Sequence, residues 1–134
     1  MSRQKQKGTA FESAIVEYLQ NQLCDDTIER RALNGTADRG DISGVTFCGH
    51  RVTLECKNEN RMRLAEYIRE AETEAANDSA HHYAVIHKKR GVGISSAQTT
   101  GQQYATMPLH MLVSIIIEAN YWYEEAHENK ENKK

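Results

Sequence analysis

The segment RVTLECK at residues 51–57 constrains the fold more than any other part of the sequence. Side chains in a β-strand alternate between two faces, so the apolar residues at 52, 54 and 56 share one face. Thr53, Glu55 and Lys57 then share the other face. A carboxylate and an ammonium group on one face of a strand have two interpretations. They form either a solvated charge pair, which contributes little to stability, or part of a metal-dependent active site.

The composition is that of one globular domain. The chain has 134 residues, of which 39 % are hydrophobic and 27 % are charged, and it contains a single proline. A domain of this length buries roughly 68 % of the surface that its unfolded chain exposes, which is enough for a core. We therefore expect one domain over residues 1–126, followed by a frayed tail at residues 127–134.

Nothing in the sequence indicates a membrane or an oxidising compartment. Residues 1–13 are basic but contain no apolar stretch typical of a secretory signal. The longest apolar run, LVSIII, is too short to cross a bilayer. The three cysteines form no C-x-x-C pair, which disfavours both a disulfide framework and a zinc site. We expect a cytoplasmic protein with no membrane partner.

Apolar periodicity predicts an α/β fold in which helices flank a small mixed sheet. A helix is expected over 9–23, a short strand near 25–33 and a loop over 34–41. Strands at 41–47 and 51–57 should form a hairpin, with a bulge at Gly44. A second helix is expected over 62–76, a strand over 81–89, an irregular loop over 91–103, a short strand at 104–107 and a last helix over 108–126. The outer face of the second helix should carry Glu66, Arg69, Glu70, Glu72 and Glu74.

Folding the hairpin places several chemical groups at one end of the sheet. Asp41 enters the first hairpin strand, and Glu55 and Lys57 lie on its partner strand. Glu12 on the first helix could overhang the same end. Carboxylates with a strand carbonyl form a hard oxygen set that suits Mg²⁺, with Mn²⁺ as a substitute. A lysine adds positive charge that stabilises a phosphate in its transition state. Glu12 has a second interpretation, because Thr9 and Glu12 also fit a helix capping box.

These residues carry a resemblance to a known family. Asp41 followed by "ECK" at 55–57 is similar to the D-x(n)-E-x-K signature of the PD-(D/E)XK nuclease superfamily. The segment "KGTAFE" around Glu12 resembles the helix-one element of its Holliday-junction resolvases, which include archaeal and short phage-encoded proteins. The resemblance implies a restriction-endonuclease-like αβββαβ core and a Mg²⁺-dependent endodeoxyribonuclease. For a phage-encoded protein it implies the host cell cytoplasm.

The resemblance also implies residue roles. Asp41 and Glu55 would bind the metal together with the backbone carbonyl of Cys56, and Glu12 would bind it through water. Lys57 would position the attacking water or stabilise charge. The chain departs from the usual pattern because Gly40 occupies the position that often holds proline. Asp38, in the same loop, competes with Asp41 as the first acidic ligand.

A Holliday-junction resolvase would act in DNA recombination and repair. A four-way junction has two-fold symmetry, so cutting opposed strands requires two active sites and implies a homodimer. The apolar helix over 108–126 is the candidate interface, although it could instead pack on the sheet. The alternatives are a nuclease of the same superfamily for flaps, single strands or duplex DNA, a non-catalytic DNA-binding module on this fold, and an α/β interaction protein.

Basic residues are clustered although the net charge is −2. In a DNA-binding protein such clusters contact phosphates, whereas in other proteins they form solvated turns. The strand-flanking histidines 81, 82 and 87 lack the spacing of a metal site. The candidate DNA-binding residues are Lys5, Lys7, Arg30, Arg31, Arg39, Arg61, Arg63, Lys88, Lys89 and Arg90.

Overall fold

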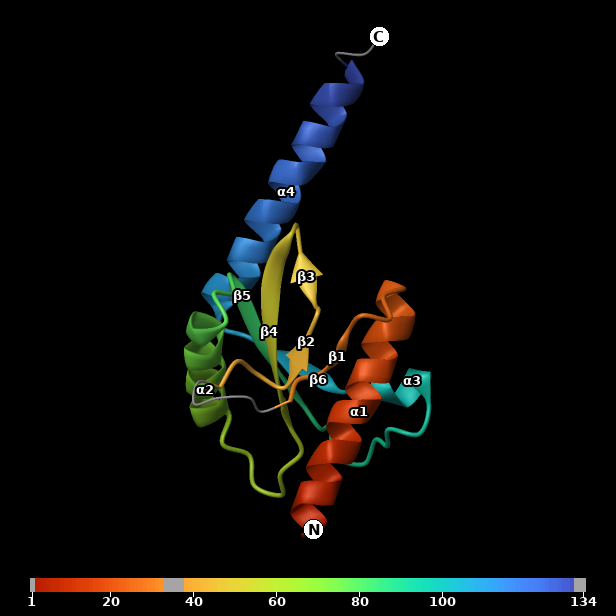
Figure 1. Ribbon diagram of the computed structural model, residues 1–134. Helices are drawn as coiled ribbons and strands as arrows, with labels where there is room; N and C mark the ends of the chain where they lie inside the picture. Colours follow the sequence, from red (N-terminus) through yellow and green to blue (C-terminus); the bar gives the residue numbers. More distant parts are fainter. Residues whose placement is uncertain (1, 33–37, 132–134) are drawn as a thin grey trace.

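The computed structural model describes residues 2–32 and 38–131, with side chains described through residue 128. Part of the predicted 34–41 loop and the last three residues of the predicted tail lie outside the described residues. Figure 1 shows the elements, which are α1 (Arg3–Leu23), β1 (Glu29–Arg30), β2 (Ile42–Ser43), β3 (Thr46–Phe47), β4 (His50–Lys57), α2 (Leu64–Asn77), β5 (His82–His87), α3 (Ala97–Thr100), β6 (Tyr104–Thr106) and α4 (Leu109–Glu131).

The strands form one mixed sheet in the order β1-β2-β4-β5-β6, and β3 extends the hairpin with β4. Only the β4–β5 pair is parallel among the described strands, with Val52 beside His82 and Lys57 beside His87. A parallel pair needs a crossover connection, and α2 provides it between β4 and β5. The predicted α/β architecture, a mixed central sheet flanked by helices, is confirmed.

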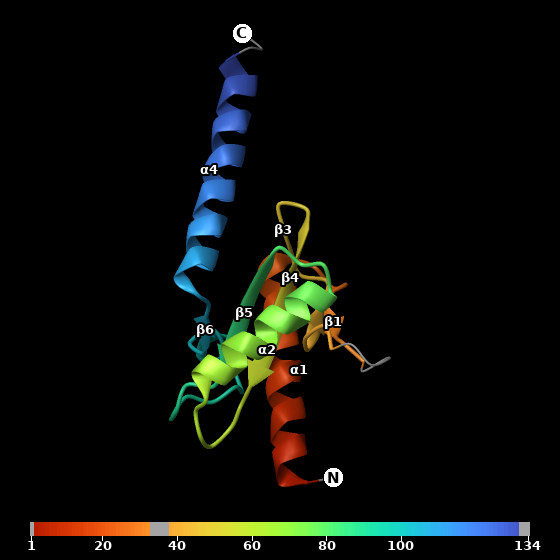
Figure 2. The same cartoon turned by 90° about the vertical axis from the view of Figure 1, so that its left-hand side faces the viewer.

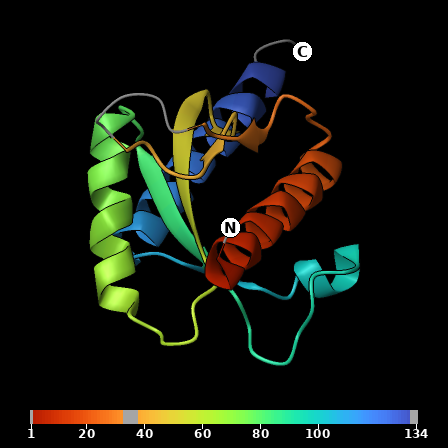
Figure 3. The same ribbon diagram turned by 60° about the horizontal axis from the view of Figure 1, so that its bottom comes forward.

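Helices cover both faces of this sheet. Figure 3 shows α1 on one side of β4 and β5 and α2 on the other. The α1 side contains a core that includes Phe11, Ile15 and Leu54, and the α2 side contains Tyr67 and Val85. Strand β4 is therefore buried on both faces from residue 53 to residue 56. The predicted alternation of its faces is confirmed, but the face that carries Glu55 is not solvated.

The hairpin contains the predicted bulge. Ile42 of β2 pairs with Leu54, whereas Thr46 of β3 pairs with Arg51. Between these two pairs, the three residues 43–45 on one arm oppose the two residues 52–53 on the other, which is the one-residue excess of a β-bulge. Gly44 lies at this point with φ +92°, a conformation that residues with a Cβ rarely adopt. The bulge divides the predicted 41–47 strand into β2 and β3.

Three helix predictions need correction. Helix α1 begins at Arg3, where the Ser2 side chain accepts a hydrogen bond from the Lys5 amide. Thr9 lies inside the helix, so the capping-box interpretation of Glu12 is wrong. Residues 97–100 in the predicted irregular loop form α3, because Ser96 and Thr99 cap its first turn. The last helix extends to Glu131, five residues beyond its predicted end at 126.

Helix α4 rests on the sheet near its beginning and extends beyond it (Figures 1 and 2). Met111 is buried in the α2-side core, and Glu118 lies 3.4 Å from the ring of buried His82. Within the described residues, no helix combines the length and apolarity needed to cross a membrane.

Gly40 supplies a test of how tightly the loop before β2 is packed. It has φ +93°, and a Cβ there would lie 2.8 Å from Thr53 Cγ2 and 3.1 Å from the Leu54 carbonyl oxygen. Gly40→Ala should therefore lower the free energy of unfolding by about 2–4 kcal/mol in urea titrations. Gly49→Ala is the matched control, since Gly49 also has positive φ but no atom within 4 Å of its Cβ position. It should cost only about 1 kcal/mol, and equal losses would contradict the proposed packing.

Candidate active site

The sequence-predicted site residues line one cavity of about 500 Å³. Asp41, Glu55 and Lys57 come from the hairpin, and Cys56 lies between the latter two on β4. Glu12 reaches the same cavity from the middle of α1. Counting along the hairpin predicted that Asp41, Glu55 and Lys57 would lie together. Glu12 joins them from the third turn of α1, not from a capped helix start.

Backbone pairing fixes the position of Asp41. Its amide donates to the Leu54 carbonyl at 3.0 Å, and its carbonyl accepts from the Arg31 amide at 2.8 Å. Its side-chain oxygen Oδ2 also accepts a hydrogen bond from the Cys56 amide at 2.7 Å. The Asp41 carboxylate is therefore held against the middle of β4 by both backbone and side-chain bonds.

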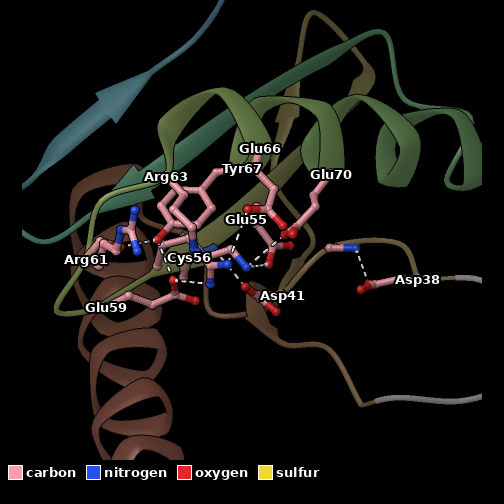
Figure 4. A network of polar contacts seen from close by, with 12 residues as sticks. Asp38, Asp41, Glu55, Cys56, Glu59, Arg61, Arg63, Glu66, Tyr67 and Glu70 are labelled. Atoms are coloured by element: carbon pink, nitrogen blue, oxygen red, sulfur yellow. Dashed lines mark hydrogen bonds and ion pairs between the residues drawn. The ribbon is translucent and has the colours of Figure 1, made fainter.

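Asp38 does not occupy an equivalent position. Its side chain is exposed, accepts a hydrogen bond from the Gly40 amide at 3.0 Å and stabilises the turn before β2. It is absent from the residues that line the cavity. Of the two candidate first acids, Asp41 is the one that the fold directs toward Glu55, as Figure 4 shows.

Glu55 and Lys57 form a buried ion pair, not a solvated one. Glu55 is 6 % exposed, and its carboxylate lies 3.5 Å from the Lys57 ammonium. Lys57 also contacts Glu70 of α2 at 2.8 Å and lies over the Tyr67 ring. Helix α2 therefore closes this face of β4 and holds the lysine beside the cavity.

Sequence reasoning missed two carboxylates in this region, Glu70 and Glu74. Both were placed on the outer face of α2, but Glu74 is only 5 % exposed and faces the sheet. The buried stripe of α2 begins at Tyr67, which had not been counted as apolar, and continues through Ala71 and Glu74. Including Tyr67 would have rotated the predicted face and directed Glu74 inward.

Glu55, Glu70 and Glu74 form a compact acidic cluster. Among the described residues they are the one set of three metal-binding side chains whose ligand atoms lie within 4.8 Å of one another. Figure 4 shows Glu70 directed toward Glu55 and Asp41. Glu12 is not part of this set. Its carboxylate pairs with Arg30 at 3.0 Å. Its position is compatible with a contact to a metal through water.

Burial of these carboxyl groups raises their pKa values. Desolvation and the nearby Glu55 charge raise the pKa of Asp41 to about 8, although the bond from the Cys56 amide opposes this. Desolvation and the adjacent Glu74 raise the pKa of Glu55 to about 9. Desolvation also raises the pKa of Glu74 to about 7. Each group is therefore costly to ionise in the absence of a compensating positive charge.

Two neighbours of Glu55 on β4, Cys56 and Lys57, behave differently. Desolvation lowers the pKa of Lys57, but the hydrogen bond to Glu70 and the Glu55 charge outweigh it and raise the pKa above its usual range. Lys57 is therefore a permanent cation at neutral pH. Burial and the Asp41 charge raise the pKa of the Cys56 thiol, which makes it a poor nucleophile.

A divalent cation fits this donor set. One oxygen of Glu55 and one of Glu74 are buried without a hydrogen-bond partner. Unpaired buried carboxylate oxygens are costly, and a hard cation such as Mg²⁺ or Mn²⁺ would satisfy them. Glu55 belongs both to the predicted set with Asp41 and the Cys56 carbonyl and to the cluster with Glu70 and Glu74, so it is the ligand that both arrangements require.

Half of the predicted DNA-binding residues surround this cavity. Arg61 and Arg63 line it directly. Lys7, Lys88 and Arg90 line an adjoining hollow that shares Asn58, Glu59 and Asn60 with the first. Lys7 and Arg90 both bond to Asn60, at 2.8 Å and 3.1 Å. These residues come from α1, the segment after β4 and the segment after β5.

The remaining basic candidates do not line the cavity or the adjoining hollow, although Arg30 lies beside the cavity through its partner Glu12. Arg31 and Arg39 line a separate pocket, where Arg31 pairs with buried Asp78 at 3.2 Å. Arg30 pairs with Glu12. The Lys89 ammonium lies over the Tyr104 ring, and Lys5 is an exposed residue of the first turn of α1. The structure therefore gives Arg31 a folding role and does not group it with the cavity.

The comparisons with known proteins gave no relative. No family model, curated protein or solved structure matches the chain. The functional assignment therefore depends on the geometry of the cavity and on the sequence pattern.

The buried carboxyl groups predict an unusual pH dependence in buffer that contains EDTA. Their folded pKa values of about 8, 9 and 7 lie above the ordinary values of 3.8 for Asp and 4.5 for Glu. Between these ranges the folded chain binds more protons than the unfolded chain. Their contribution to stability is therefore present at low pH and is lost as the pH rises through about 7 to 9. The melting temperature should therefore be lower at about pH 9 than at about pH 6, and thermal melts at these two pH values check this.

Asp41→Asn removes one of the repelling charges and retains an acceptor for the Cys56 amide. It should raise the melting temperature of the metal-free protein at the alkaline end by about 3–5 °C, equivalent to about 1 kcal/mol. Mg²⁺ should stabilise the unsubstituted protein and not this variant. Glu72→Gln, on the exposed face of α2, is the control and should change neither value. A melting temperature insensitive to both pH and Mg²⁺ would contradict the described charge cluster.

Proposed function

We propose that this protein is a metal-dependent endonuclease of the PD-(D/E)XK type that hydrolyses phosphodiester bonds in branched DNA. The expected substrate is the four-way junction, as in Holliday-junction resolvases. The observation that carries the proposal is the convergence of Asp41, Glu55, the Cys56 backbone and Lys57 on one cavity. These are the residues of the D-x(n)-E-x-K pattern, and they line the same cavity, as counting along the hairpin predicts.

The order of elements supports the same assignment. Helix α1 is followed by β1, the β2–β3 hairpin arm, β4, α2 and β5, and the hairpin arm pairs with β4 as a single bulged strand. With β2 and β3 taken as one strand, this order is the αβββαβ arrangement expected from the resemblance. The candidate residues lie on the second and third strands of that arrangement and on its first helix.

Each group has a role that follows from its position. Asp41 and Glu55 would hold Mg²⁺ with the Cys56 carbonyl, and Glu12 would contact it through water. When bound, the metal would polarise the phosphate and lower the pKa of a water molecule. Lys57 places a permanent positive charge at the cavity, where it would stabilise the charge that develops on the phosphate. Glu70 holds the lysine in place through their 2.8 Å contact.

The basic rim favours a nucleic acid over a small phosphodiester. Lys7, Lys88 and Arg90 flank a hollow next to the cavity, and Arg61 and Arg63 line the cavity itself. Lysine and arginine contact backbone phosphates and so position DNA without reading its sequence. An enzyme with such a rim would select DNA by shape, which is the property required to recognise a junction.

Cleavage assays test the proposal directly. With Mg²⁺ or Mn²⁺, the protein should cut a labelled four-way junction, and EDTA should abolish cutting. Asp41→Asn, Glu55→Gln and Lys57→Ala should each lower the rate by about 100-fold or more, because each removes a charge that acts on the reacting phosphate. Glu72→Gln should retain full activity.

The choice of substrates separates the possible outcomes. Flap, single-stranded and linear duplex DNA of the same sequences are the comparison substrates. Equal cutting of linear duplex would overturn the junction assignment and leave a nuclease. Cutting that survives both Asp41→Asn and Lys57→Ala would overturn the assigned site. Junction binding without cutting by the native protein, in the presence of either metal, would indicate a non-catalytic binding module.

The salt dependence of junction binding tests the basic rim. Each phosphate contact contributes about 0.9 to the slope of log K against log salt concentration. Arg90→Ala should reduce that slope by about 1 and weaken binding on every DNA structure tested. Arg69→Ala, an exposed arginine of α2 away from the cavity, is the matched control. Binding is measured by fluorescence anisotropy titration. If the two substitutions changed the affinity and the salt slope equally, DNA would not bind at the proposed basic rim.

A further inference from the structure

Three arginines line a pocket of about 270 Å³ beside the hairpin. Arg31 follows β1, Arg39 precedes β2, and Arg51 lies near the start of β4. Ser43 and Thr46, on either side of the bulge, line the same pocket. We call it the arginine pocket. No described residue lines both this pocket and the acidic cavity, so the two are separate.

The arginine pocket carries an excess of positive charge. Asp78, which directly follows α2, is the one acidic residue among the described residues that line it. Its carboxylate is 3 % exposed and lies 3.2 Å from the Arg31 guanidinium and 3.6 Å from that of Arg51. Because one carboxylate balances one guanidinium, the three lining arginines leave a formal excess of two positive charges.

Asp78 fixes two of the guanidinium groups and leaves most of their donors free. Arg31 uses Nη2 for the carboxylate, and Arg51 uses Nη1, which also donates to the Asp78 carbonyl at 3.0 Å. A guanidinium has five N–H donors. The Nε of Arg31 is buried and has no hydrogen-bond partner among the described residues. An unpaired buried donor is costly, and an oxyanion beside Arg31 would supply an acceptor.

Arg39 extends into solvent from a fixed backbone. Its side chain is exposed and takes part in no ion pair within the described part of the chain. The carbonyl of the preceding Asp38 accepts a hydrogen bond from Asn77 Nδ2 at 2.7 Å, and the Asp38 carboxylate accepts one from the Gly40 amide at 3.0 Å. The segment that leads into β2 is thereby held beside α2 (Figure 1). Arg39 can therefore bind a ligand without a change in the backbone.

The lining of the pocket favours a small oxyanion over a whole nucleotide. Val45 and Val52 are its apolar residues, and no aromatic side chain of the described residues lines it, so a base would have nothing to stack on. Its volume lies just below the range of about 300–1,000 Å³ for pockets that hold drug-sized ligands. Guanidinium groups bind phosphate through pairs of parallel N–H···O bonds, and serine and threonine hydroxyls also donate to phosphate oxygens.

We propose that the arginine pocket binds a phosphate group that carries two negative charges. Such a group is inorganic phosphate or a phosphate monoester, whose second pKa is about 6. It balances the excess charge of the pocket, whereas a phosphodiester carries one charge and leaves one arginine uncompensated. The group belongs either to a small phosphorylated molecule or to the end of a nucleic-acid strand. The proposal depends on the residues of this pocket and not on the assigned nuclease activity.

Chemical-shift titration of the isotope-labelled full chain locates the anion. At about pH 8, above the second pKa of a monoester, methyl phosphate should shift the amide signals of residues 43–46 until they saturate. Dimethyl phosphate, a diester, should bind about 10-fold more weakly, because it carries half the charge. Equal affinity for the two probes would overturn the assignment to a dianion. Equal shifts with sodium chloride at the same ionic strength would indicate an adventitious ion only and would overturn the site.

Substitution of Arg39 tests the pocket without breaking the ion pairs of Asp78. Arg39→Gln should weaken the binding of methyl phosphate by about 10-fold, because it removes one charged donor group. Arg69→Gln is the matched control and should leave the affinity unchanged, since Arg69 is an exposed residue of α2 that does not line the pocket. Both variants should melt like the native chain. Unchanged affinity in Arg39→Gln would overturn the proposal.

The basic rim of the acidic cavity is the competing site for an anion. Arg90 lines the hollow next to that cavity and does not line the arginine pocket. Arg90→Ala should therefore bind methyl phosphate as the native chain does. If the affinity fell in Arg90→Ala and not in Arg39→Gln, the anion would bind at the rim and the proposal would be wrong.

Two oligonucleotides distinguish the sources of the phosphate. A single strand with a terminal phosphate is compared with the same strand ending in a hydroxyl, in EDTA so that cleavage does not interfere. Shifts at residues 43–46 with the phosphorylated strand alone would support the proposal and assign the pocket to strand ends. Shifts with methyl phosphate and neither strand would support it and assign the pocket to a small phosphorylated molecule. Equal shifts with both strands would indicate backbone phosphates and overturn the assignment to a dianion.

Discussion

Strand β4 is covered on both faces, and this constraint determines the chemistry of the site. A strand with one solvated face could expose Glu55 and Lys57 to water, where their charges would have little effect. Helix α2 instead buries Glu55 to 6 % exposure and closes Lys57 between two carboxylates. Removing ions from water is costly unless they are paired. Buried Glu55 and Lys57 therefore need groups of opposite charge in contact with them.

The hairpin connects this burial to the cavity. The bulge at Gly44 and the positive φ of Gly40 allow the chain to enter β2 with the Asp41 carboxylate against the Cys56 amide. Asp41 and Glu55 are thereby held as neighbouring carboxyl groups, each with a raised pKa. The protein places too little positive charge beside these two carboxyl groups to offset their mutual repulsion when both are ionised. A bound divalent cation would supply the missing positive charge, which is why the site suits a metal better than an isolated ion pair.

The acidic cavity and the exposed apolar surface of α4 are formed by different parts of the chain. The cavity is formed by local pairing of the hairpin and by α1 and α2, and it is complete within one chain. Helix α4 begins as part of the core through Met111 and then leaves it, so many of its apolar side chains stay exposed.

The sequence by itself predicted the sheet, the hairpin with its bulge and the grouping of Asp41, Glu55 and Lys57, because strand alternation and hairpin counting depend only on local spacing. The position of Glu12 beside them depends on how α1 packs on the sheet. Tertiary structure decided the rest. Whether a face of β4 is buried depends on which helix packs on it, and periodicity alone did not place Glu74 inward. Likewise, the apolar helix predicted over 108–126 was equally compatible with packing on the sheet, and only the direction in which α4 leaves the body exposes its apolar side chains.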